Sequence, residues 1–334
     1  MVAWQRSQGR HGLPWQDQRD PYRVWLSEIM LQQTQVTTVL AYYARFLQRF
    51  PDVAALAQAP LDDVLAAWSG LGYYSRARNL HRCAQAVMTA HGGRFPASAE
   101  QLALLPGIGR STAAAIAAFC FGERAAILDG NVKRVLTRAL GFGADLAVAR
   151  HERELWVRAC ELLPPAAADM PAYTQGLMDL GATVCLARRP NCLLCPLQGD
   201  CVAQREGMPQ AYPVKTRKLK RTRREHWWLW LEHAGAVWLQ QRPATGVWAG
   251  LWSLPLLDDE AALDAVTRRL QVHAEPQPVI EHALTHFDWT LHPRRAVLGS
   301  AAAVEAALGP GRWTALDALD TVGLPAPLKK LLTS

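Results

Sequence analysis

One stretch decides the fold of the first half of the chain. It reads Leu105-Pro106-Gly107-Ile108-Gly109-Arg110-Ser111 and continues into Thr112-Ala113-Ala114-Ala115. Helices are predicted on both sides of it, at Ser98–Leu105 and Arg110–Phe121. Gly107 and Gly109 permit positive φ and a close backbone approach. The amides that open the second helix favour a phosphate, and Arg110 adds positive charge. A Pro-Gly turn alone is a weak signal, but with a small-residue helix after it the stretch predicts a helix–hairpin–helix, which binds the DNA backbone.

The segments around this hairpin are also predicted to be helical. Residues 22–50 contain no Gly or Pro and repeat apolar side chains at helical spacing. Two aspartates after Pro60 mark the start of a helix at Leu61–Trp68. Further helices are expected at Val132–Leu140, His151–Leu163 and Ala172–Leu180. Because strand signals are scarce here, we predict an all-α domain over residues 1–202.

A basic run separates this domain from a second one. Lys215–Arg224 reads KTRKLKRTRR, and it indicates a linker over residues 203–224, either a solvated tether or a line of cations along phosphates. Residues 1–224 carry 28 Lys and Arg against 17 Asp and Glu, whereas residues 225–334 carry 8 against 12. Short aromatic and β-branched runs at Trp227–Leu231 and Ala236–Gln241 predict a hairpin, and Glu260–Leu270 predicts a helix. We therefore expect a small α+β domain at 225–334.

Composition limits the class of protein. The chain has 334 residues, 50% of them hydrophobic and 19% charged, which fits two globular domains. Its longest apolar run has nine residues, Ala113–Phe121, whereas a membrane-spanning helix needs roughly 20. The N-terminus has no apolar core typical of a secretory signal. We expect a cytoplasmic, nucleoid-associated protein with no membrane partner. The basic first domain favours nucleic acid as a partner, although many basic proteins are merely soluble.

Four cysteines lie close together in the sequence. Cys185, Cys192, Cys195 and Cys201 have the spacing C-x6-C-x2-C-x5-C. A structural zinc site usually has two C-x2-C-like pairs, and only one is present here. Uneven spacing suits the larger [4Fe–4S] cubane, so one such cluster is favoured over zinc, and both over four unliganded thiols. The cysteines at 83, 120 and 160 lie in apolar helical stretches and are interpreted as small buried hydrophobic residues.

Together these motifs resemble a known family. A helix–hairpin–helix, then Asp129 about 20 residues on, then the four-cysteine loop is the pattern of the endonuclease III superfamily of DNA glycosylases. Within it, the chain closely resembles the MutY family of adenine DNA glycosylases. The matching stretches are Leu13–Trp15, Trp25–Val36, Trp68–Leu80 and Leu177–Ala182. The resemblance implies excision of adenine mispaired with 8-oxoguanine or guanine in double-stranded DNA, by a protein acting as a monomer.

The resemblance also implies roles for individual residues. Glu28 would protonate N7 of adenine, Asp129 would stabilise the oxocarbenium ion, and Asn131 would orient the carboxylate or water. Burial in an apolar helix would raise the pKa of Glu28, and a helix cap would keep Asp129 ionised. The ordinary alternatives are an exposed glutamate and a cap alone. The adenine pocket would comprise Arg10, Trp15, Leu31, Val36 and Gln175. Contacts to DNA and 8-oxoguanine would come from Gln33, Tyr73, Gly107, Gly109, Arg110, Ser111, Lys133, Thr285 and His286.

Three differences from related proteins matter. Lyase-competent relatives have a lysine where this chain has Ser111, so a monofunctional glycosylase that uses water is expected, with Lys133 able at most to trap product. Residues 225–334 resemble a Nudix domain, but the sixth residue after Gly250 is Leu256 instead of the glutamate of the Nudix box, so no pyrophosphohydrolase activity is predicted. The family's Phe-Ser-His recognition loop reads Leu284-Thr285-His286 here. Loss of the aromatic ring would weaken stacking, and the simpler interpretation is a β-turn with a surface histidine.

Three alternatives stay open. The first is an endonuclease III-like glycosylase and lyase for oxidised pyrimidines. The second is a non-enzymatic iron–sulfur DNA-binding protein with structural carboxylates. The third is a Nudix nucleotide hydrolase with a DNA-binding arm.

Overall fold

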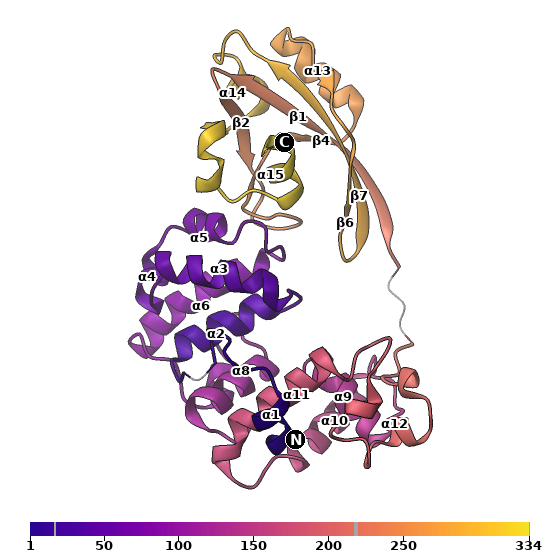
Figure 1. Cartoon of the computed structure of the whole chain (residues 1–334). Helices are drawn as coiled ribbons and strands as arrows, with labels where there is room; N and C mark the ends of the chain where they lie inside the picture. Colours follow the sequence, from indigo (N-terminus) through magenta and orange to yellow (C-terminus); the bar gives the residue numbers. More distant parts are fainter. Residues whose placement is uncertain (17, 217–219, 334) are drawn as a thin grey trace. The chain divides into compact units, whose positions relative to one another are not determined.

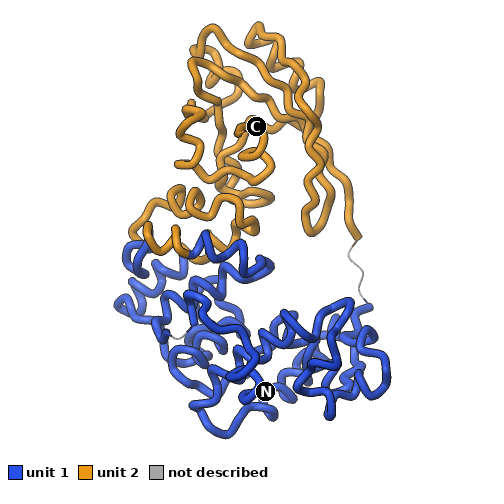
Figure 2. The backbone as a smooth tube through the Cα atoms, viewed as in Figure 1, with its two compact units in different colours: residues 1–43, 50–57, 82–218 blue, residues 44–49, 58–81, 219–334 orange. Residues whose placement is uncertain are grey.

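The computed structural model describes residues 1–16, 18–216 and 220–333, and the chain folds into two compact units. The first unit comprises residues 1–43, 50–57 and 82–218, and the second comprises 44–49, 58–81 and 219–334 (Figure 2). The division does not follow the order of the chain, because residues 44–49 and 58–81 belong with the C-terminal part. Residues 217–219 of the expected linker lie outside the described part.

The first unit is helical (Figure 1). Among the described residues before Thr222 no strand forms, which confirms the all-α prediction. Its elements are α1 (Val2–Gln8), α2 (Pro21–Leu31), the first part of α3 (Val36–Arg49), α4 (Val53–Gln58), the second part of α6 (Ser75–His91), α7 (Ala99–Leu102), α8 (Arg110–Ile116), η1 (Ala117–Phe121), α9 (Gly130–Leu140), α10 (Ala149–Glu161), η2 (Ala167–Asp169), α11 (Met170–Thr183), η3 (Cys192–Leu194), α12 (Val202–Arg205) and η4 (Pro209–Ala211).

Two predicted helices are interrupted in the structure. Residues 22–50 do not form one helix, because α2 ends at Leu31 and α3 begins at Val36. Gln33 between them has φ 57, a left-handed conformation that no α-helix can contain. The helix expected at Arg110–Phe121 changes at Ala117 from α to π geometry, a rare form that is frequent at functional sites.

The core of the first unit is built around α9 and α11. The cluster contains Ala115, Val132, Leu136, Leu155 and Leu180, all less than 4% exposed. Cys83 and Cys120 are buried as expected, but Cys160 is exposed, because it lies on the outer side of α10. The expectation for Cys160 was therefore wrong: an apolar neighbourhood in sequence does not fix which face of a helix a residue occupies.

The second unit combines a mixed sheet with helices. Its strands are β1 (Thr222–His233), β2 (Ala236–Gln241), β3 (Trp252–Ser253), β4 (Leu256–Leu257), β5 (Glu275–Pro276), β6 (Ile280–Ala283), β7 (Phe287–Val297) and β8 (Arg312–Ala315). The helices are α5 (Leu61–Ala67), α13 (Glu260–Leu270), α14 (Val304–Leu308), η5 (Leu316–Thr321) and α15 (Ala326–Thr333). The predicted β1–β2 hairpin and the helix at Glu260–Leu270 are confirmed.

The longest strands of this sheet pair in parallel. β1 and β7 are in register from Thr222 with Phe287 to Glu232 with Val297, whereas the other pairs are antiparallel. Residues 203–224, assigned to a linker by composition, thus include most of α12, all of η4 and the first residues of β1. No helix of the described residues is long and apolar enough to cross a bilayer.

Candidate functional site

A cleft of about 1480 Å³ in the first unit brings together residues that are far apart in sequence. It is lined by the loop after α1, by α2, and by the starts of α8, α9 and α11. Of the sequence-predicted residues, the cleft is lined by Arg10, Trp15, Glu28, Leu31, Gln33, Val36, Ser111, Asp129, Asn131 and Gln175. All five predicted pocket residues and all three predicted catalytic residues therefore share one cavity.

Two carboxylates in this cleft have opposite environments. Burial raises the pKa of Glu28 to about 8, and the negative charge of Asp129 contributes to the rise. The Glu28 side chain remains partly exposed to the cleft itself. Asp129 caps α9, and its Oδ1 accepts a hydrogen bond from the Val132 amide at 2.8 Å. Burial thus favours the protonated form of Glu28, whereas Asp129 accepts a backbone hydrogen bond at the start of α9.

The segment that carries Asp129 is held by hydrogen bonds from two sides. The Ser111 hydroxyl accepts a hydrogen bond from the Leu128 amide at 3.0 Å. Arg134 donates to Asn131 Oδ1 at 2.9 Å and to the Gly181 carbonyl at 2.6 Å. The Asn131 amide oxygen is therefore engaged by Arg134.

Gly181 lets α11 approach the segment that contains Asn131 closely. A Cβ at position 181 would lie 2.7 Å from Asn131 Cβ, so only glycine fits there without a shift. Arg134 and Gly181 were not singled out in the sequence analysis. The Gly-Ala pair in the Leu177–Ala182 stretch is the only sequence signal for this approach.

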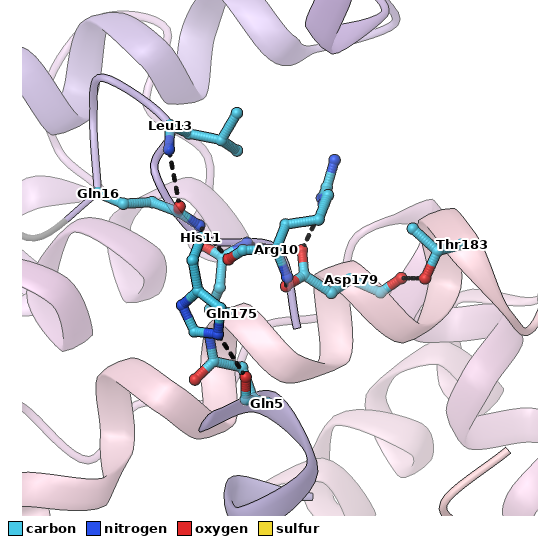
Figure 3. A network of polar contacts seen from close by, with 8 residues as sticks. All are labelled: Gln5, Arg10, His11, Leu13, Gln16, Gln175, Asp179 and Thr183. Atoms are coloured by element: carbon cyan, nitrogen blue, oxygen red, sulfur yellow. Dashed lines mark hydrogen bonds and ion pairs between the residues drawn. The ribbon is translucent and has the colours of Figure 1, made fainter. Parts of the chain in front are cut away.

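A buried carboxylate joins two predicted pocket residues (Figure 3). Asp179 Oδ1 accepts from Arg10 Nε at 2.7 Å and from Gln175 Nε2 at 2.8 Å, while its Oδ2 accepts from the Arg10 amide at 2.9 Å. The Asp179 side chain is 1% exposed, and that of Arg10 is 31% exposed. Sequence reasoning did not assign Asp179 a role. Its signal was the spacing from Gln175, one turn of helix away.

The loop before α2 is fixed by further polar contacts. His11 Nε2 lies 3.0 Å from the Gln5 carbonyl, and Gln16 joins the Leu13 amide to the Arg10 carbonyl at 3.1 Å each (Figure 3). Trp15 is 8% exposed and packs edge-on against Tyr43, with ring centroids 5.3 Å apart. The aromatic wall of the cleft is therefore rigidly placed.

The hairpin and Lys133 lie outside the described cleft lining. Gly107 has φ 76, as predicted, whereas Gly109 precedes α8 with an extended backbone, φ -81, that any residue can adopt. A Cβ at Gly109 would meet no atom within 4 Å, so the close approach expected there was wrong. The Arg110 guanidinium stacks on the Trp156 ring at 4.0 Å. Lys133 Nζ forms an ion pair with Glu152 Oε1 at 2.8 Å.

The other predicted contacts lie in the second unit. Tyr73 has φ 48 and is 47% exposed. The β6–β7 hairpin is visible in Figure 1. Thr285 and His286 lie in the turn between these two strands, and the His286 carbonyl accepts from the Thr222 amide at 3.2 Å. That hydrogen bond places the end of the basic run beside the turn.

The four predicted metal ligands line a common small pocket of the first unit. Cys185, Cys192, Cys195 and Cys201 are all partly exposed to it. Arg138 Nη1 donates a hydrogen bond to Cys185 Sγ at 3.3 Å. Among the described side chains, no group of three or more Cys, His, Asp or Glu is arranged to hold a metal ion.

Comparison with known proteins agrees with these features. A family model for HhH-GPD superfamily base excision DNA repair proteins matches residues 26–159, and a NUDIX domain model matches residues 226–334. The chain is 35% identical to an adenine DNA glycosylase of Buchnera aphidicola subsp. Acyrthosiphon pisum, over 99% of this chain and 95% of that protein. It is 32% identical to the Homo sapiens adenine DNA glycosylase, over 99% and 72% respectively. The structure of a thermostable thymine-DNA glycosylase matches with a TM-score of 0.54 and 28% identity, over 61% of this chain and 93% of that one.

Proposed function

Because the chain belongs to the adenine DNA glycosylase family, we propose that its cleft receives an adenine extruded from duplex DNA and hydrolyses the N-glycosidic bond. The glycosidic bond cannot be reached inside a stacked duplex, so the nucleotide must leave the helix first. The protein is thereby a hydrolase of base-excision repair that leaves an abasic site and free adenine.

The pairing of Glu28 with Asp129 carries this proposal. With a pKa of about 8, Glu28 holds a proton at neutral pH and donates it to N7, which makes adenine a better leaving group. As the bond breaks, positive charge develops on the sugar, and the Asp129 carboxylate stabilises it. Water then adds to the sugar and releases a proton, which restores the protonated Glu28 carboxyl. Asn131, held by Arg134, and Ser111 keep Asp129 in place for this step.

The remaining cleft residues select the base. Trp15, Leu31 and Val36 offer apolar surface to a purine ring, while Arg10 and Gln175 offer hydrogen bonds to its edge. Asp179 fixes both of these polar side chains at once. Adenine is thus recognised by groups that are oriented before it arrives, which avoids the entropic cost of ordering them on binding.

The base opposite the adenine is recognised by a different set of residues. We propose that Gln33 and Tyr73 contact or wedge beside 8-oxoguanine, or guanine, and that Thr285 and His286 sense the lesion from the second unit. Gly107, Gly109 and Arg110 hold the backbone phosphates, with Lys133 nearby. The DNA substrate is double-stranded and binds one copy of the chain.

A [4Fe–4S] cluster fits the four-cysteine loop. Cys185, Cys192, Cys195 and Cys201 would hold it, and Arg138 already donates to one of these sulfurs. When bound, the cluster supplies a covalent cross-link that fixes the loop. The same loop carries Arg188 and Arg189, so fixing it also presents cations to DNA.

The reaction can be tested on end-labelled duplexes containing A:8-oxoguanine, A:T or thymine glycol:A, with and without alkali. We expect strand breakage only after alkali and only in the adenine strand of the 8-oxoguanine duplex. Glu28→Gln is expected to abolish it, whereas Glu161→Gln on the exposed face of α10 is the matched control. Breakage of the thymine glycol duplex without alkali would instead assign the chain to the glycosylase and lyase class. Unchanged behaviour of Glu28→Gln would refute the proposed acid.

A further inference from the structure

The loop that presents Tyr73 has an unusual backbone. We call residues 69–74 the wedge loop. Tyr73 has φ 48, and Gly70 and Gly72 have φ 103 and 71, so three of the six residues have positive φ. A non-glycine residue in that region is strained and persists only where its surroundings impose it. The Tyr73 side chain is nonetheless 47% exposed. An exposed aromatic side chain on a strained loop needs braces behind the loop.

Part of the bracing is local. Arg76 is 8% exposed and donates to the carbonyls of Leu71 and Gly72, each at 3.2 Å. Trp68 Nε1 donates to the same Gly72 carbonyl at 3.2 Å. These contacts fix the middle of the wedge loop but not its two ends.

The ends are braced by the C-terminal segment. The Leu324 carbonyl accepts from Ser69 Oγ at 3.1 Å and from Tyr74 Oη at 2.9 Å. Tyr74 Oη in turn accepts from the Gly70 amide at 3.2 Å. Ser69, Tyr74 and Leu324 are all less than 8% exposed. One carbonyl, about 250 residues away in the chain, thus closes the loop on both sides of Tyr73.

Other contacts fix that carbonyl. A Cβ on Gly323 would lie 2.8 Å from Leu65 Cβ, so the segment lies directly against the end of α5. The Trp252 amide donates to the Gly323 carbonyl at 2.9 Å. Residues 58–81 also group with the C-terminal residues as one compact unit (Figure 2). The wedge loop is therefore structurally part of the unit that contains the Nudix domain.

We propose that the C-terminal segment 322–325 positions Tyr73 for base extrusion, with the Leu324 carbonyl as its point of contact. This role rests on the proposed function, because it assigns the shape of the wedge to a segment outside the helical domain. The C-terminal part then contributes to extrusion as well as to sensing the opposite base. Without the two hydrogen bonds, the wedge loop relaxes and Tyr73 no longer compensates for lost stacking.

The test measures extrusion without chemistry. A Glu28→Gln chain is bound to a duplex with 2-aminopurine in place of the target adenine opposite 8-oxoguanine, and fluorescence reports unstacking. Adding Ser69→Ala and Tyr74→Phe is expected to lower the extrusion equilibrium about tenfold, because two hydrogen bonds to one buried carbonyl are lost. Affinity for a duplex that already contains an abasic analogue is expected to change by less than about twofold, since no base is extruded from it.

Gln240→Ala is the matched control. Gln240 Nε2 donates to the Leu308 carbonyl at 2.7 Å, so the change removes a side-chain hydrogen bond in the same unit without touching the wedge loop or the segment that braces it. Tyr74→Phe alone leaves no cavity and serves if the double variant misfolds. The proposal is overturned if the Ser69 and Tyr74 variants extrude as well as their parent, or if Gln240→Ala loses as much. If the Glu28→Gln parent itself gives no signal while the unsubstituted chain excises no adenine, the proposed function fails as well.

Discussion

Replacing Glu28 by glutamine is expected to stabilise the protein while it abolishes excision. Burial, and secondly the charge of Asp129, raise the pKa of Glu28 from 4.5 to about 8. Between these pH values the folded chain keeps a proton that the unfolded chain releases. The stability of the fold is therefore fully present below about pH 4.5, and part of it is lost as pH rises to about 8.

The magnitude follows from the same numbers. At about 1.4 kcal/mol per pH unit, the rise corresponds to about 5 kcal/mol. Water in the cleft screens the partly exposed carboxyl, so a measured loss of about 2–4 kcal/mol is expected. Glutamine has nearly the same shape but cannot ionise, so it escapes this loss.

The assay compares urea unfolding of Glu28→Gln and its parent at about pH 5 and about pH 9. The variant is expected to match the parent at the lower pH and to exceed it at the higher one. Glu161→Gln, at an exposed glutamate, is expected to show no such pH dependence. Single-turnover excision by the parent is expected to fall as pH rises through about 8. An equal stability difference at both pH values, or excision that persists undiminished at about pH 9, would refute the reasoning.

Four further outcomes are expected. Asp129→Asn keeps the helix cap but loses the charge, so single-turnover excision should fall by about 100-fold or more, and the pH at which the acid loses its proton should move downward. Asp179→Ala leaves Arg10 without its buried partner and should cost about 3 kcal/mol in urea unfolding, with Asp179→Asn milder. Gly181→Ala would press on Asn131 and should lower the melting temperature, at a cost of about 1–3 kcal/mol, together with excision. Incubation with 8-oxo-dGTP and magnesium should release no 8-oxo-dGMP, and a released product would revive the hydrolase alternative.

Local signals in the sequence predicted the elements whose ends are marked by proline, aspartate or glycine. Pro60 and the aspartates after it mark α5, and Asp259 caps α13 at the predicted start. The glycines of the 105–111 stretch predicted the hairpin, because each residue acts on its own backbone. Burial of Glu28 was likewise predictable, because apolar residues surround it in sequence.

Long-range relations were not predictable in this way. Nothing local to Glu28 shows that Asp129 faces it across the cleft, and the parallel pairing of β1 with β7 depends on segments about 65 residues apart. The break at Gln33 was missed because glutamine is a good helix former, and the surrounding structure overrides that preference. Asp179 was missed because a lone carboxylate in a helix shows no partner until Arg10 is placed beside it.

The hydroxyl of Ser111 also bears on how such enzymes can diverge. It accepts a hydrogen bond from the amide of Leu128, the residue immediately before Asp129. A lysine ammonium at this position has no lone pair with which to accept that hydrogen bond. The single substitution that would supply an amine nucleophile would therefore release the chain that aligns the carboxylate. Position 111 can therefore hold the Asp129 segment for hydrolysis or supply the amine for elimination, but not both. A change from one reaction to the other would need a second hydrogen-bond acceptor for the Leu128 amide.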